Sequence, residues 1–389
     1  MRKQLTEKNR GVLIISPFFR PNIGGVETHL DDLCEFLRTH GYSVFVITYQ
    51  PLTTKTSGLK IERKENLEIH RISWPAHNLF HKLEPYPILE WMYLFPGLFL
   101  SGTLFLFKRS QDIQVIHAHG FVGAFITKLL SRIFRIRSVA STHAIYSLQK
   151  RTRMAIMIRF LLRSFDRILT LSYQSKNELC DIGIEQPQKI AVYTYWIDQT
   201  LFIPQNKLQA KKQCGWENKF IVLFVGRLIK IKGVQLLIDA ASAVNKEISF
   251  AIIGDGPLEA EVSRASRDLK NIIFLGKIEN NHLVQFYNAA DCVIVPSQYE
   301  EGFGRVILEA LSCGTPVLAS RRGGIPEVID ESVGILFEPT VVDIAREVTN
   351  LYTNHDKLAT LAKNCRSYAE LKFSNKNAEA ITKSYSGEL

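Results

Sequence analysis

A loop, a helix, a helix cap and a strand follow one another in residues 297–317, SQYEEGFGRVILEALSCGTPV. The apolar residues of the middle part recur at helical spacing, and Gly314 suits the C-terminal cap of that helix. Working outward, short apolar runs alternate with helical patterns through both halves of the chain. This alternation is typical of βαβ units and predicts an α/β fold built on parallel sheets.

The apolar runs define two sets of expected strands. They lie at residues 12–15, 44–48, 115–116, 139–141, 168–171 and 190–193 in the first half, and at 220–225, 248–253, 272–275, 292–295 and 317–319 in the second. A polar stretch, residues 199–219, separates the two sets. We therefore predict two Rossmann-like doubly wound domains, residues 1–200 and 201–370, facing each other across a cleft.

Composition excludes several classes of protein. With 389 residues, 46% hydrophobic and 22% charged, the chain has enough apolar material for two cores and too many charges for a fibre. The six cysteines form no CxxC pair, so neither a disulfide scaffold nor a structural zinc site is expected.

Two apolar segments bear on location. The first apolar run is cut off by Ser16-Pro17, so we expect no cleavable signal segment and a cytoplasmic protein. Residues 91–107 carry no charge but are slightly short for a membrane span, and Pro96-Gly97 interrupts them. They are interpreted as a buried or interfacial helix.

The net charge of +10 belongs to the first half of the chain. Residues 1–200 hold 26 Lys and Arg against 16 Asp and Glu, which leaves 22 against 22 for residues 201–389. Basic and apolar residues interleave between Lys128 and Arg167, where Asp166 is the one acid. Such a surface attracts anions, and a membrane is one candidate, although a solvated basic face fits the same pattern.

In open parallel sheets, ligands bind beyond the carboxyl ends of the strands. Gly24-Gly25 follows the first expected strand, where bare backbone N–H groups at a helix N-terminus suit a phosphate, and an ordinary turn is the alternative. Gly226-Arg227 and Lys232 follow another strand and place cations beside the next helix. A solvated basic turn is the alternative there. Because the chain has no Asp-x-Asp pair, we expect these fixed cations, not a metal, to neutralise a diphosphate.

Glu301 and Glu309 are spaced to hold two ends of an extended ligand, about 12 Å apart if the whole stretch is helical. With no adjacent cation, they suit ribose and sugar hydroxyl groups. The alternative is a surface Glu301 and a Glu309 paired with a lysine. His117 and His119 have metal-ligand spacing but no third ligand, so polar lining of a strand end is favoured. No nucleophile elbow, P-loop or complete dinucleotide fingerprint occurs.

Several of these motifs occur in an order that resembles glycosyltransferase family 4, retaining nucleotide-sugar enzymes of the GT-B fold. They are residues 226–233, Gly254-Asp255-Gly256, 274–276, Pro296-Ser297, 301–309, 314–317 and 323–327. The resemblance runs from Gly24 to the C-terminal helix, and it implies that residues 371–389 return to the first domain.

The resemblance also implies roles for individual residues. The implied catalytic residues are His143, Arg227, Lys232 and Glu301, and the implied donor-binding residues are Gly24, Gly25, Gly226, Phe303, Gly304 and Glu309. Arg227 and Lys232 would bind the diphosphate, Glu301 the transferred sugar and Glu309 the ribose. Two positions depart from the family pattern: Tyr195-Trp196 replaces the usual Asn-Gly, and Arg305 replaces an aliphatic residue.

The expected activity is retaining transfer of a sugar from a UDP- or GDP-sugar to an acceptor hydroxyl, in cell-surface polysaccharide or glycolipid synthesis. No metal, no other cofactor and no nucleic-acid partner are expected. The acceptor would be a sugar or a lipid-linked molecule, reached by a cytoplasmic protein bound peripherally to the inner face of the membrane. A sugar-nucleotide epimerase and a non-catalytic carbohydrate-binding protein are the alternatives.

Overall fold

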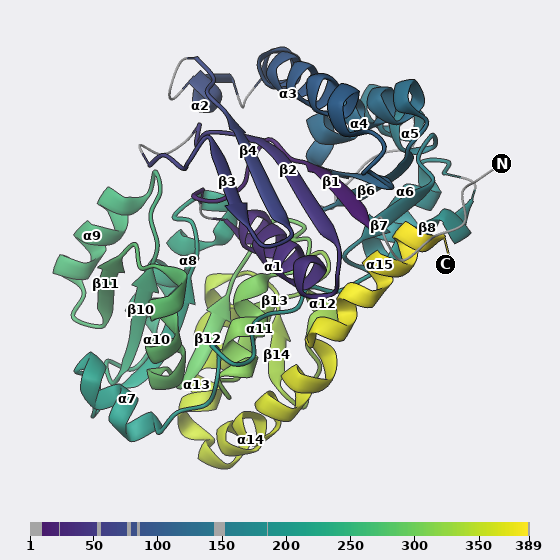
Figure 1. The fold of residues 1–389 in the computed structure, drawn as a ribbon. Coiled ribbons are helices and arrows are strands. Elements are labelled where there is room, and N and C mark those ends of the chain that lie inside the picture. The colour runs from purple at the N-terminus through teal and green to yellow at the C-terminus, as the bar shows by residue number, and fades with distance from the viewer. Residues whose placement is uncertain are drawn as a thin grey trace. The chain divides into compact units, whose positions relative to one another are not determined.

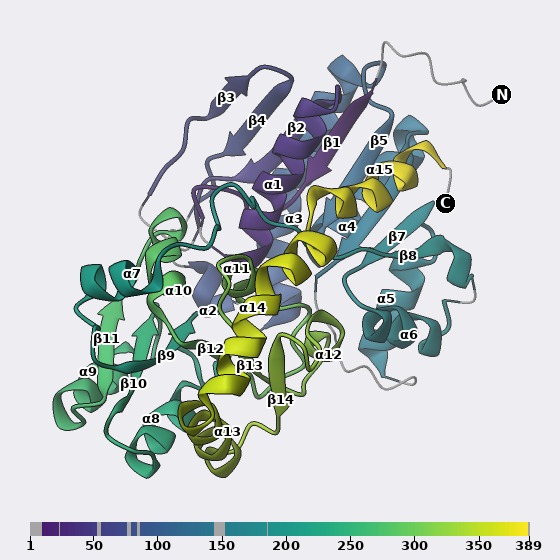
Figure 2. The same ribbon diagram turned by 90° about the horizontal axis from the view of Figure 1, so that it is seen from below.

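The computed structural model describes residues 10–22, 24–52, 56–75, 79–83, 86–143, 152–184 and 186–387. Within them the chain forms two compact units (Figures 1 and 2). Unit 1 holds the described residues up to His143, 152–194 and those from Asn377 on, and unit 2 holds 195–376. The predicted limits at 200/201 and 370/371 are thus replaced by 194/195 and 376/377. The first limit shifts because Tyr195 lies against Phe303 of unit 2, with ring centroids 5.5 Å apart.

Unit 1 is built on an eight-stranded sheet with the order β3-β4-β2-β1-β5-β6-β7-β8. The strands are β1 (Gly11–Ile15), β2 (Ser43–Tyr49), β3 (Ile61–Lys64), β4 (Leu67–Ile72), β5 (Val115–His119), β6 (Arg137–Thr142), β7 (Arg167–Thr170) and β8 (Ile190–Val192). All neighbours pair in parallel except β3 and β4, which are antiparallel. The six predicted strands are confirmed, and the edge strand β3 and its neighbour β4 were missed.

The helices of unit 1 connect these strands. They are α1 (Gly25–Thr39), α2 (Leu79–Leu83), α3 (Pro87–Arg109), α4 (Gly120–Phe134), α5 (Arg153–Leu162), α6 (Tyr173–Asp181) and α15 (Glu379–Ser386). The predicted apolar segment 91–107 lies inside α3, whose Leu94, Leu98 and Leu106 join the core beside β1 and β2. By length and composition α3 is the one helix of the described residues that could cross a membrane, and 22% of that apolar window is buried in unit 1.

Unit 2 is built on a six-stranded parallel sheet with the order β11-β10-β9-β12-β13-β14. The strands are β9 (Phe220–Val225), β10 (Ile248–Ile253), β11 (Ile272–Gly276), β12 (Cys292–Val295), β13 (Val317–Ser320) and β14 (Gly334–Phe337). The five predicted strands are confirmed, and the edge strand β14 was missed. The strand order reverses direction between β9 and β12, which is where doubly wound sheets bind ligands.

Helices also connect the strands of unit 2. They are α7 (Lys207–Cys214), α8 (Val234–Ala243), α9 (Glu259–Asp268), α10 (Leu283–Ala289), α11 (Arg305–Ser312), α12 (Ile325–Val328), α13 (Val341–Thr353) and α14 (His355–Lys372). In the C-terminal segment expected to return to the first domain, α14 is followed by a 3₁₀ turn at Asn375–Ala378 and then by α15. In unit 1, Arg137 Nε of β6 donates a hydrogen bond to the carbonyl oxygen of Ser384 in α15 over 3.1 Å.

Candidate functional site

Three loops interlock at the carboxyl ends of β9, β10 and β12 in unit 2. Gly233, with φ of +77°, is the N-cap residue of α8 and lies against the loop that follows β12. A Cβ at this position would lie 2.1 Å from the carbonyl oxygen of Pro296 in that loop. Gly254, with φ of +150°, follows β10, and a Cβ would lie 1.9 Å from the carbonyl oxygen of Gly226. Only glycine fits both positions, because any side chain would meet backbone atoms. The loops therefore hold one another in place before any ligand binds.

Lys232 and Glu301 meet within these loops. Lys232 ends the 3₁₀ turn Lys230–Lys232, and its Nζ lies 2.5 Å from Oε1 of Glu301. The hydroxyl of Ser297 donates a hydrogen bond to Oε2 of the same carboxylate. Nζ of Lys232 also lies 5.1 Å from the ring centroid of Tyr299, a distance typical of a cation–π contact.

The charge of Lys232 is supported by its neighbours. Burial alone lowers the pKa of its ammonium group, but Glu301 and Tyr299 raise it by more, so the pKa lies above its ordinary value. Glu301 is 8% exposed, which contradicts the alternative of a surface carboxylate. The sequence argument that no cation is adjacent to Glu301 was wrong, because the cation comes from a loop 69 positions earlier.

Gly226 and Arg227 directly follow β9. The Arg227 side chain is exposed and forms no ion pair within the part of the chain that the structure describes. The backbone on either side is fixed, since Gly226 N–H donates to the Ile253 carbonyl oxygen over 3.0 Å and Leu228 N–H to that of Asp255 over 2.8 Å. An accessible guanidinium on a rigid loop is suited to binding an anion.

Phe303 and Gly304 lead into α11. Gly304 is the N-cap residue with φ of +80°, and Phe303 is buried with its ring between Tyr195 and Phe373 at centroid distances of 5.5 and 6.2 Å. The Phe303 ring therefore belongs to the core of unit 2. The prediction that the backbone of Phe303 and Gly304 contacts a donor sugar stays a prediction.

Glu309 lies on α11 and is almost fully buried. Its Oε1 accepts a hydrogen bond from Arg305 Nε over 3.1 Å, and its Oε2 accepts one from the Tyr287 hydroxyl over 2.7 Å. The expectation that no cation is adjacent was wrong for Glu309 too, because Arg305 lies one helical turn earlier. The helix begins only at Arg305, so the stretch from Glu301 to Glu309 is not helical throughout. A ribose contact at Glu309 stays a prediction.

The two departures from the family pattern lie close together in unit 2. Arg305 Nη1 donates a hydrogen bond to the carbonyl oxygen of Trp196 over 3.4 Å. Both Tyr195 and Trp196 are buried. The loop that carries them is thereby joined to the first turn of α11.

In unit 1, Gly24 is the N-cap of α1 and Gly25 is its first residue. A Cβ at Gly25 would meet no atom within 4 Å, whereas one at Gly24 would lie 2.3 Å from Oε2 of Glu27. The carboxylate of Glu27 therefore already lies at the positive end of α1, where negative charge is favoured. The prediction that Gly24 and Gly25 approach a phosphate stays a prediction.

His143 belongs to a group of four histidines in unit 1. Its Nε2 lies 2.8 Å from Nδ1 of His119, and its ring centroid lies 5.9 Å from that of His29. His117 contacts the Tyr385 hydroxyl through Nδ1 at 2.7 Å and the Ser141 hydroxyl through Nε2 at 2.8 Å.

Burial favours the neutral form of His117, His119 and His143. It lowers the pKa of His117 to about 3 and that of His143 to about 4, and it holds the pKa of His119 well below its ordinary value. His117 and His119 lie on β5 itself and line the end of that strand, as expected from the sequence. A role for His143 beside a reacting centre stays a prediction.

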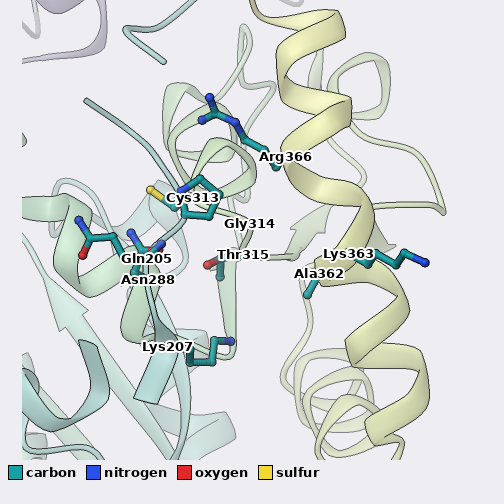
Figure 3. Close-up of a pocket in the computed structure, with 10 residues that line it drawn as sticks. Gln205, Lys207, Asn288, Cys313, Gly314, Thr315, Ala362, Lys363 and Arg366 are labelled. Carbon is teal, nitrogen blue, oxygen red and sulfur yellow. The ribbon is translucent and has the colours of Figure 1, made fainter. Parts of the chain in front are cut away.

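A pocket of about 340 Å³ in unit 2 contains none of the predicted site residues (Figure 3). It is lined by Pro204, Gln205, Lys207, Asn288, Cys313, Gly314, Thr315, Ala362, Lys363 and Arg366. Two of its polar side chains already form hydrogen bonds with the backbone. Asn288 donates to the carbonyl oxygen of Ile203, and Arg366 donates to those of Phe202 and Ser312. We therefore do not place the donor there.

Sequence reasoning missed Ser297, Tyr299 and Tyr287 as partners of the two glutamates. The spacing of Arg305 and Glu309 was a readable signal, because residues four apart on a helix are neighbours. No comparable signal linked Tyr287 to Glu309, since they lie on different helices.

Comparison with solved structures shows which fold this is. Sucrose-phosphate synthase from Thermosynechococcus elongatus superposes with a TM-score of 0.81 at 22% identity, covering 97% of this chain and 99% of that one. Anabaena HepE, solved in complex with UDP and glucose, gives a TM-score of 0.77 at 21% identity, with 97% and 100% covered. The chain thus has the GT-B glycosyltransferase fold with two Rossmann-like domains.

Sequence comparison then gives the family. The family model described as Glycosyltransferase Family 4 matches residues 23–199, and the model for Glycosyl transferases group 1 matches residues 206–370. The phosphatidylinositol N-acetylglucosaminyltransferase GPI3 subunit of Saccharomyces cerevisiae is 24% identical over 360 residues, 88% of this chain and 75% of that protein. N-acetyl-alpha-D-glucosaminyl L-malate synthase of Bacillus anthracis is 25% identical over 323 residues, with 79% of each chain covered. The chain belongs to glycosyltransferase family 4.

Proposed function

We propose that this glycosyltransferase moves a sugar from a nucleoside-diphosphate sugar to an acceptor hydroxyl, with retention at the anomeric carbon and without a metal. The observation that carries the proposal is the ion pair of Lys232 and Glu301, with the exposed Arg227 in the same β9–α8 loop as Lys232, at the carboxyl end of a parallel sheet where its strand order reverses. UDP is the first nucleotide to test, because HepE was solved with UDP and glucose.

The reaction separates charge when the diphosphate leaves the sugar. Lys232 is held in place by Glu301, and Arg227 extends from a loop whose backbone is fixed on either side, so both cations would stabilise the growing negative charge. Glu301 would accept hydrogen bonds from sugar hydroxyl groups through the lone pairs that Lys232 and Ser297 leave unused. Its second task is to keep Lys232 charged.

We further propose that the acceptor is lipid-linked and that the enzyme works at the cytoplasmic face of a membrane, in glycolipid or cell-surface polysaccharide synthesis. Two observations support this. The excess positive charge lies in the first half of the chain, and the relative from Saccharomyces cerevisiae is named for a phosphatidylinositol substrate.

Nucleotide binding gives the first test. UDP should raise the thermal unfolding temperature more than GDP does, because a ligand that binds only the folded state stabilises it by mass action. Arg227→Ala removes one charge-assisted contact of about 1.5 to 3 kcal/mol and should lower UDP affinity and turnover about ten- to a hundredfold. Arg264→Ala, at an exposed position on α9, is the matched control and should change neither.

The remaining parts of the proposal need separate measurements. Activity that remains after EDTA treatment supports metal independence. A product linkage with the same anomeric configuration as the donor sugar supports retention. Conversion of the donor sugar without any acceptor would indicate an epimerase. If the protein binds a nucleotide sugar but releases no nucleoside diphosphate with any acceptor tested, it would be a carbohydrate-binding protein.

A further inference from the structure

The outer face of α3 is an uninterrupted apolar stripe. Ile88, Met92, Leu100, Leu104 and Phe107 are 75%, 58%, 61%, 54% and 72% exposed, and the one further residue at this spacing is the exposed Pro96. A helix on the surface of a soluble protein normally turns polar residues outward, whereas α3 is apolar on its outer face as well as on its inner face. Exposed apolar surface on this scale marks an interaction site.

The inner face of α3 is fastened to the sheet of unit 1. Tyr49 of β2 inserts its hydroxyl into the helix, accepting a hydrogen bond from Leu98 N–H over 3.1 Å and donating one to the Leu94 carbonyl oxygen over 2.6 Å. Gly97 and Gly102 allow close contact, since a Cβ at Gly97 would lie 2.6 Å from the Tyr49 hydroxyl oxygen. Because α3 is part of this core, it can lie on a bilayer without leaving unit 1 to cross one.

The apolar surface continues onto α4 and α5. Figure 1 shows α3 beside α4, and the rings of Phe107 and Phe134 lie 5.3 Å apart where these helices end. Ile133 of α4 is 57% exposed. Nζ of Lys128 in α4 lies 3.6 Å from the ring centroid of Phe160 in α5, and Phe160 is 69% exposed.

Cations surround this apolar surface. The exposed residues Lys108, Arg132, Arg135, Arg153 and Arg159 lie at the ends of α3 and α4 and along α5. Neither α4 nor α5 contains an acidic residue. Part of the basic segment predicted from the sequence, residues 144–151, lies outside the described residues.

We propose that α3, the end of α4 and α5 form a docking surface on unit 1 for a bilayer with anionic lipid headgroups. This surface matches the interface of an anionic bilayer. Its apolar side chains suit the acyl chains, and its arginines suit the negatively charged headgroups above them; two of the three helices carry no acid. The helix lies in the plane of the bilayer, with its stripe among the upper acyl chains. This inference deepens the acceptor part of the proposed function, because a docked enzyme meets a lipid-linked acceptor directly.

Flotation of the full chain with vesicles tests the surface. The protein should float with vesicles of equal parts phosphatidylcholine and phosphatidylglycerol at about 150 mM salt, and should not float with phosphatidylcholine alone. Leu100→Gln/Leu104→Gln/Phe107→Gln should lower the partition coefficient about tenfold or more. Arg132→Gln/Arg159→Gln should lower it by about fivefold for each charge removed, and less at high salt.

Leu208→Gln/Leu371→Gln is the matched control, because both leucines are 77% exposed but lie on α7 and α14 of unit 2. It should float like the parent protein. Equal flotation of the stripe variant and the control overturns the proposal, and so does the absence of flotation with anionic vesicles. A stripe variant that instead changes the size-exclusion mass would assign the surface to a second copy of the chain. UDP stabilisation measured on the same variants separates this inference from the transferase proposal, since it should be unchanged in all of them.

Discussion

The pair of Arg305 and Glu309 allows the most quantitative prediction, for Arg305→Leu. The two side chains are 8% and 4% exposed, and Arg305 Nε lies 3.1 Å from Oε1 of Glu309. Removing one member of a buried ion pair costs about 3 to 5 kcal/mol, because the remaining charge is left without a partner. The Tyr287 hydroxyl still donates to Glu309 over 2.7 Å. We therefore expect a smaller loss of unfolding free energy, about 2 to 3 kcal/mol, because this hydrogen bond remains.

Urea unfolding followed by tryptophan fluorescence measures this loss if unit 2 alone is observed. Four tryptophans occur in the chain, and Trp196 and Trp216 lie in unit 2. A Trp74→Phe/Trp91→Phe background removes the two of unit 1, so the transition reports on the unit that contains Arg305.

A double-mutant cycle separates the ion pair from packing. Glu309→Gln keeps the shape of the side chain, and combined with Arg305→Leu it removes both charges. The loss of unfolding free energy in the double variant should then be smaller than the sum of the two single losses, by about 1 kcal/mol or more. Arg346→Leu removes an exposed arginine of α13 and should leave the unfolding midpoint unchanged. If Arg305→Leu unfolds at the same urea concentration as Arg346→Leu, the reasoning about burial and pairing is refuted.

Three further predictions concern the other groups described above. Lys232→Met removes the cation that pairs with the buried Glu301 and leaves it only neutral hydroxyl partners, Ser297 and Tyr299, so kcat/KM for transfer should fall about ten- to a hundredfold, whereas Lys232→Arg should recover part of the loss; an unaffected Lys232→Met enzyme would remove Lys232 from the site. Burial lowers the pKa of His117 to about 3, so below pH 6.5 the unfolded chain binds a proton there that the folded chain does not, and this lowers the unfolding free energy by about 1.4 kcal/mol per pH unit as pH drops from 6.5 toward 4. The lowered pKa values of His119 and His143 act in the same direction, and Asp31, whose pKa burial raises to about 6, partly opposes them. His117→Asn should make that pH profile less steep while the exposed His282→Asn should not, and a profile identical in all three proteins would contradict the assignment. Tyr49→Phe removes the hydroxyl that joins Leu94 to Leu98 inside α3 and should cost about 1 to 3 kcal/mol, measured as a lower melting temperature, while Tyr93→Phe, whose hydroxyl bond is exposed, should melt close to the parent protein.

The sheets were largely predictable because their central strands are buried on both faces. Such strands are continuous apolar runs, as in 220–225, and a run of that kind flanked by helical patterns has few other interpretations. The missed strands lie at or next to sheet edges. β3 has the sequence IERK with three exposed positions, and β4 alternates buried with partly exposed residues. β3 and β4 pair with each other across a two-residue turn, and their polar residues hid that hairpin from a search for apolar runs.

For the candidate site, the sequence singled out residues but did not indicate how they pair. Glu301 was identified from its local motif, yet its partner Lys232 comes from a loop that only the sheet topology brings close. The identification of Glu301 as a free acceptor failed for this reason, whereas the partner of Glu309 is the local residue Arg305, whose spacing was readable. A buried carboxylate requires a partner, so the burial of both glutamates accounts for the nearby cations.

The two departures from the family pattern are best understood as one structural feature. Where the family usually has Asn-Gly, this chain places the larger Tyr195 and Trp196, and both are buried in unit 2. Tyr195 packs against Phe303 at the start of α11, and Arg305 joins the Trp196 carbonyl oxygen to Glu309. An aliphatic residue at 305 could fill space beside Trp196 but could not donate to either oxygen. Because Arg305 bonds to both partners, a change in the loop also alters the surroundings of Glu309, so the position of that carboxylate depends on residues more than one hundred positions earlier in the sequence.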